Sequence, residues 1–150
     1  MLFNWKPILS KVFMTNTLVS EYVGKTANGN PVIGSLTIPS GIFPAIEFHE
    51  VSGFDNSFND DELYSRKYNY QISIFSQDNS HYKVQNTIDS LMRSLGFTCY
   101  HNDEVYEPDV KVFHRVLLYS RTLSNEQASI LEAKYLKNIK RKRLLYAKNW

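Results

Sequence analysis

The sequence predicts an α+β protein: an antiparallel β-sheet covered on one face by helices, with a basic helix at the C-terminus. Three observations support this. The predicted elements run helix, strands, helix, strands, helix, without alternating β–α units. Residues 64–75 alternate as a strand does, and residues 84–95 repeat at helical spacing. A chain of 150 residues fits one domain with a real core. We assign 1–123 to a single α+β domain and 124–150 to a basic helical extension.

The N-terminal segment predicts a short amphipathic helix followed by a turn and a strand. Asn4 can cap the helix, and Pro7 falls in its first turn, where the missing N–H is harmless. Its apolar face contains Ile8, Leu9, Val12 and Phe13. An apolar pattern resumes over 18–23 and breaks at Gly24. Residues 27–31 are typical of a turn, with a hairpin tip as one interpretation, and 32–38 of a strand.

The stretch 43–75 predicts two strands joined by a polar, acidic loop. The strand over 45–51 has no cleanly apolar face, and the loop follows it over 54–62. The strand over 64–75 alternates best: its two faces are Tyr68, Tyr70, Ile72, Ile74 and Lys67, Asn69, Gln71, Ser73. We expect one face of this strand to be wet. The uncovered face of the sheet is expected to be aromatic and to need a partner, which a ring of identical subunits would supply.

The third part of the chain predicts a helix and further strands. Asn79 or Ser80 can cap a helix that Gly96 ends, with its apolar positions at Val84, Ile88, Leu91, Met92 and Leu95. A strand then runs through Cys99. We expect a loop over 101–104, a turn over 107–109 and a final, central strand over 110–121.

The C-terminal segment predicts a basic helix that opens with a capping box of Ser124 and Gln127. Its cationic positions, which we expect to bind a partner, are Lys137, Lys140, Arg141, Lys142 and Arg143. The alternative function is nucleic-acid binding through this helix. A mobility-shift assay at two salt concentrations separates the two functions. Only a dedicated nucleic-acid-binding protein should keep its complex at physiological salt.

Composition narrows the function classes. The net charge of +2 gives no global field for nucleic acid, and a single cysteine, Cys99, excludes an internal disulfide. We read Cys99 as a small buried residue of a reducing cytoplasm. The N-terminus lacks the layout of a signal peptide, and no apolar run is long enough for a membrane span, so no membrane partner is expected.

Enzymatic and metal-binding patterns are weak. The acidic residues of 54–62 lack calcium-loop spacing, and Asp109-Val110-Lys111 lacks the upstream Pro-Asp pair of a metal-dependent nuclease. The histidines are scattered without metal spacing: His49, His81, His101 and His114. We therefore expect no enzyme activity, no catalytic or metal-binding residues and no cofactor.

Several motifs between Pro44 and Ser120 together resemble the tail terminator, or tail-completion, family of tailed bacteriophages. They are PAIEFHE at 44–50, DNS at 55–57 with acidic residues after it, YNYQISIF at 68–75, MRSLGF at 92–97, YEPD at 106–109 and FHRVLLYS at 113–120. The resemblance implies a small α+β structural protein of the virion neck, made in the host cytoplasm. It also implies a hexameric ring that ends growth of the tail tube and joins it to the head connector. The implied partners are further copies of the chain, the tail tube protein and the connector, adaptor or stopper proteins of the head, with transient contact to passing DNA.

A ring through which DNA passes should not hold it tightly, and an acidic lumen avoids the counterion release that strengthens binding. We therefore expect the acidic loop to line the channel or to meet the tail tube. Its residues are Asp55, Asp60, Asp61 and Glu62. Phe54 and Phe58 are expected to anchor on a neighbouring protein.

Overall fold

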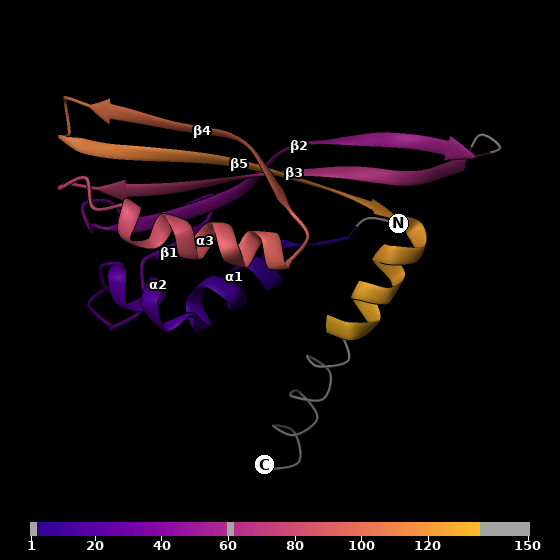
Figure 1. Cartoon of the computed structure of the whole chain (residues 1–150). Coiled ribbons are helices and arrows are strands. Elements are labelled where there is room, and N and C mark those ends of the chain that lie inside the picture. Colours follow the sequence, from indigo (N-terminus) through magenta and orange to yellow (C-terminus); the bar gives the residue numbers. More distant parts are fainter. Residues whose placement is uncertain (1–2, 60–61, 136–150) are drawn as a thin grey trace, which may run out of the picture.

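The computed structural model is α+β, as predicted, with four helices and a five-stranded sheet in the order β1-β2-β3-β5-β4 (Figure 1). It describes residues 3–59 and 62–135, with the backbone alone for 53–59 and 62–63. The labelled elements are α1 (Lys6–Thr15), α2 (Thr17–Tyr22), β1 (Ile33–Ser35), β2 (Ala45–Asn59), β3 (Glu62–Ser76), α3 (Tyr82–Ser94), β4 (Thr98–Glu107) and β5 (Val112–Ser124). A further helix starts at residue 125 and is described to 135.

The sheet is mixed, so the prediction of a purely antiparallel sheet is wrong at one edge. β1 pairs with β2 in parallel, from Ile33 opposite Ile46 to Ser35 opposite Phe48, whereas the other pairs are antiparallel. Parallel neighbours need a connection that returns the chain to the end where the first strand began. The segment 36–44 makes this connection. Before β1, an isolated β-bridge between Lys25 and Pro31 encloses the predicted turn over 27–31.

The N-terminal helices form where the sequence predicts an apolar face. Ile8, Leu9 and Phe13 of α1 are buried. The N-cap is Trp5 rather than Asn4, although Asn4 Oδ1 accepts the Lys6 N–H at 3.1 Å. The predicted cap is therefore displaced by one residue.

Helix α3 confirms its predicted apolar face, with Val84, Ile88 and Met92 buried. Gly96 follows it at φ +83°, a conformation that favours glycine, and the Phe97 N–H donates to the Met92 carbonyl at 3.0 Å. At the other end the cap prediction is wrong, because the N-cap is His81, which makes no side-chain cap hydrogen bond.

The predicted loop over 101–104 is wrong, because β4 runs through it with one irregularity between Cys99 and His101. This strand lies at the sheet edge and is exposed almost throughout, so its sequence shows no apolar alternation. The predicted capping box is confirmed. Gln127 N–H donates to Ser124 Oγ at 3.1 Å, and Ser124 N–H donates to Gln127 Oε1 at 3.0 Å.

The core lies between one face of the sheet and α1, α2 and α3 (Figure 1). Trp5 is fully buried at its centre, with ring centroids 4.8 Å from Phe3 and 4.9 Å from Phe97. The Arg121 guanidinium lies 5.1 Å from the Trp5 ring and donates to the Leu95 carbonyl. Within residues 3–59 and 62–135, no helix has the length and apolar character to cross a bilayer.

Candidate functional site

The predicted acidic loop is largely an arm built from two paired strands. Asp55 lies in β2 opposite Arg66, and Glu62 begins β3 opposite Asn59. The loop prediction is therefore wrong at these positions. Pairing between the two strands satisfies the peptide groups that face each other, so a polar sequence can still form strands. The arm twists through register shifts on both sides of Ser57.

The remaining predicted residues of this stretch divide between the arm and the undescribed turn. Phe54 pairs with Lys67 and Phe58 with Leu63 along the backbone. Asp60 and Asp61 lie outside the described residues. The prediction that the acidic residues face a channel or tube, and that the phenylalanines act as anchors, stays a prediction.

The arm extends past the body of the sheet (Figure 1). On one side, β1 pairs with β2 only as far as Phe48. On the other, β5 pairs with β3 no closer to the turn than Ser65. The outer edge of β2 is therefore open from His49 onward among the described residues, and the end of the arm consists of two strands alone.

The two faces of the body of the sheet differ from the prediction. The aromatic face of β3, with Tyr68 and Tyr70, lies under the helices, so the uncovered face is not the aromatic one. Of the four residues predicted to form a wet face, Lys67 and Gln71 are partly exposed, but Asn69 and Ser73 are buried, at 4% and 1% exposure. Neighbouring strands shield them, and Asn69 Nδ2 donates to the Ser52 carbonyl at 2.9 Å.

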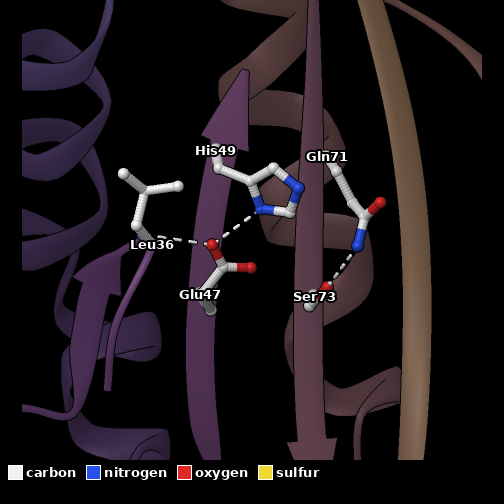
Figure 2. Close-up of polar contacts among 5 residues, drawn as sticks. All are labelled: Leu36, Glu47, His49, Gln71 and Ser73. Atoms are coloured by element: carbon white, nitrogen blue, oxygen red, sulfur yellow. Dashed lines mark hydrogen bonds and ion pairs between the residues drawn. The ribbon is translucent and has the colours of Figure 1, made fainter. Parts of the chain in front are cut away.

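A buried carboxylate organises one part of the uncovered face (Figure 2). Glu47 Oε1 lies 2.7 Å from His49 Nδ1 and accepts the Leu36 N–H at 3.2 Å. Leu36 has φ +68°, a strained value for a branched residue, and its side chain is 63% exposed. Glu47 thus holds the segment after β1 in place. On β3, Gln71 Nε2 donates to Ser73 Oγ at 3.0 Å.

A second histidine lies on the same face. His114 stacks on Phe75 with ring centroids 4.3 Å apart, and its Nδ1 is 3.6 Å from Glu107 Oε1. Burial lowers the pKa of His114, which Glu107 and Glu47 partly offset. His49 and His114 share this face because Phe75 pairs with His114 and Gln71 with His49. In the described part of the chain, no three His, Cys, Asp or Glu side chains group as metal ligands.

His81 lies at the start of α3, on the helix side of the sheet. Its Nε2 is 3.9 Å from Glu104 Oε1. Burial and the nearby charge of Arg115 lower the pKa of His81, while Glu104 raises it. No sequence pattern predicts this histidine–carboxylate pair, because it joins the start of a helix to an edge strand that was predicted to be a loop. His101 lies on that strand, opposite Leu118.

A shallow cleft of about 350 Å³ lies between the α1–α2 junction and α3. Its lining residues carry amides, hydroxyls and one leucine, and no ionisable side chain: Asn16, Asn86, Thr87, Ser90, Leu91 and Ser94. It offers hydrogen bonds but no acid, base or strong nucleophile.

The predicted basic positions lie outside the described residues: Lys137, Lys140, Arg141, Lys142 and Arg143. The helix that leads to them is docked on the body, since Ala128 is buried and Leu131 and Tyr135 pack against the core. A C-terminal helix therefore begins where predicted, and its basic half stays a prediction. No protein-family model and no curated protein matches the chain.

Proposed function

We propose that this chain is a structural virion protein of a tailed phage that forms a ring at the head-proximal end of the tail tube. In this role it stops tail growth and joins the tail to the head connector. The observation that carries the proposal is the β2–β3 arm, which leaves the body of the sheet and has an open outer edge. The resemblance between Pro44 and Ser120 supplies the class of assembly.

The arm favours assembly for a physical reason. A two-stranded ribbon standing alone in water is marginally stable, and three or more strands or a packed face are needed. An arm that extends beyond its own sheet gains that support when it lies on a neighbouring subunit. Identical subunits with such a contact form a closed ring when the contact repeats head to tail.

The charge of the arm suits a channel. Residues 55–62 contain four carboxylates and no basic residue: Asp55, Asp60, Asp61 and Glu62. Repulsion between these groups and phosphates would keep passing DNA free, whereas a basic lumen would bind it through counterion release. Contact with a tail-tube subunit is the other role we consider for the same surface.

The decisive experiment measures the mass of the full chain in solution, alone and with tail-tube and connector subunits. We expect a ring of several copies that caps tubes. A variant with Asp60→Asn, Asp61→Asn and Glu62→Gln should change ring or tube assembly. A matched variant that neutralises Glu21, Asp78 and Glu126, all exposed and outside the arm, should not. A chain that stays monomeric in the presence of both partners contradicts the proposal.

A further inference from the structure

The free edge of β4 is the second open edge of the sheet. Among the described residues β4 pairs with β5 alone, so the outer edge of Thr98–Glu107 presents peptide groups that no other described strand pairs. Large exposed side chains cluster there and in the following turn: Tyr100, Val105, Tyr106 and Val110. Exposed edges of this kind are sites for pairing with another chain unless charge prevents it.

The edge is acidic. Asp103, Glu104 and Glu107 lie on β4, and the side chains of Glu104 and Glu107 are 39% and 47% exposed. Their described neighbours are His81, at 3.9 Å from Glu104, His114, at 3.6 Å from Glu107, and Arg115, which pairs with Glu104 across to β5. Asp103 Oδ1 accepts the Glu104 N–H at 2.9 Å. Three carboxylates against the Arg115 cation leave the β4 edge with a net negative charge, because burial lowers the pKa of both histidines and favours their neutral forms.

The complementary charge lies in the same chain. Residues 136–150 contain no acidic side chain and six basic ones: Lys137, Lys140, Arg141, Lys142, Arg143 and Lys148. This segment follows the helix that starts at residue 125, directly after β5. It is the most strongly basic stretch of a chain whose total net charge is only +2.

The topology favours the tail of another copy over the chain's own tail. Asp103 and Glu107 pair with Val116 and Val112, far along β5 from Ser124. At about 3.3 Å per residue these positions lie roughly 26–40 Å from the end of β5. The helix over 125–135 leaves at the arm end of the sheet, away from the turn that joins β4 to β5 (Figure 1).

We infer that the acidic edge of β4 binds the basic segment 136–150 of a second copy of the chain. The inference rests on the proposed function, because it supplies a head-to-tail contact for the ring. Charge pairing selects the partner segment, and the exposed Tyr100 and Tyr106 offer apolar surface for its leucines and tyrosine. Self-association should weaken with salt, because exposed ion pairs are screened.

The test uses the full chain as an equal mixture of unlabelled and ¹⁵N-labelled protein, treated with a zero-length carboxyl–amine cross-linker. We expect cross-links of mixed isotope content between the β4 carboxylates and Lys137, Lys140 or Lys142. The variant D103N/E104Q/E107Q should lose them and self-associate roughly tenfold more weakly, as expected for the loss of about three exposed ion pairs. The variant E21Q/D78N/E126Q is the matched control and should retain both.

A charge swap distinguishes a lost contact from a folding defect, because a second substitution can restore the contact but cannot repair the fold. Glu107→Lys should weaken self-association, and Lys142→Glu in the same chain should restore it. Cross-links within single chains only, or a ring that assembles with no cross-link to 136–150, overturn the inference and leave the proposed function standing. A monomer that also ignores tube and connector subunits overturns both.

Discussion

Both faces of β3 carry buried side chains, but different neighbours bury them. Tyr70 and Ile72 lie under the helices in an apolar core, whereas Asn69 and Ser73, the alternate residues, face a side that none of the described helices covers. The first pair is buried by packing against another layer. The second is buried by neighbouring strands and by bonds such as that from Asn69 to Ser52. Burial alone therefore does not tell which face of a sheet holds the core.

The largest expected loss of stability comes from a substitution on the apolar face of β3. Ile72→Ala should destabilise the protein by about 2–5 kcal/mol, because it removes buried methyl groups and leaves a cavity. Gln71→Ala, next to it on the other face, should cost about 1 kcal/mol or less. Urea unfolding of the two variants measures the difference. Equal losses would mean that the uncovered face contributes as much stability as the core.

On the uncovered face, the carboxylate of Glu47 links β2 to the segment after β1. Glu47→Ala should cost about 1–3 kcal/mol, because His49 Nδ1 loses its acceptor and the Leu36 N–H keeps only the Phe48 carbonyl, at 3.3 Å. Glu47→Gln should cost less, since its amide oxygen can still accept one bond. Urea midpoints of the two variants test this order. If the alanine variant were as stable as the parent, the network in Figure 2 would not hold the segment after β1.

The third prediction concerns Ser124, which caps the C-terminal helix. Ser124→Ala removes one half of the capping box and should cost about 1 kcal/mol. Ser129→Ala, in the same helix, is the control for the change of a serine. Thermal unfolding followed by circular dichroism compares them, and equal midpoints would remove the capping box as a source of stability.

The smallest effect concerns pH and compares one histidine from each side of the sheet. Burial lowers the pKa of His81 and of His114 below the ordinary 6.5, so the unfolded chain binds protons before the folded one does. Stability should thus fall as pH drops below about 6.5 toward the folded pKa values. His81→Gln and His114→Gln should each flatten the slope of unfolding free energy between pH 7 and 5. An unchanged slope in both variants would contradict this assignment.

Short-range signals predicted the fold well. The spacing in α3, the glycine at 96 and the Ser124–Gln127 box each depend on residues a few positions apart, and the structure confirms them. Errors occurred where the outcome depends on distant partners. Residues 101–104 form a strand because β5 pairs with them. β1 is parallel to β2 because the segment 36–44 returns the chain to the end of the sheet where β1 begins.

The candidate site was harder to predict for the same reason. The sequence identified the acidic stretch after Gly53 but not its pairing into an arm, since polar residues carry no alternation signal. Glu47 and His49 were visible as neighbours on one strand face. Their link to Leu36 required knowledge of the parallel contact between β1 and β2.

The position of Trp5 gives the protein an internal optical probe. Its indole is fully buried between Phe3 and Phe97, with the Arg121 guanidinium over the ring. The chain has one other tryptophan, Trp150. In a Trp150→Phe variant, the tryptophan fluorescence would therefore come from Trp5 alone. Blue emission that shifts red as the surroundings of Trp5 open would follow unfolding without any added dye.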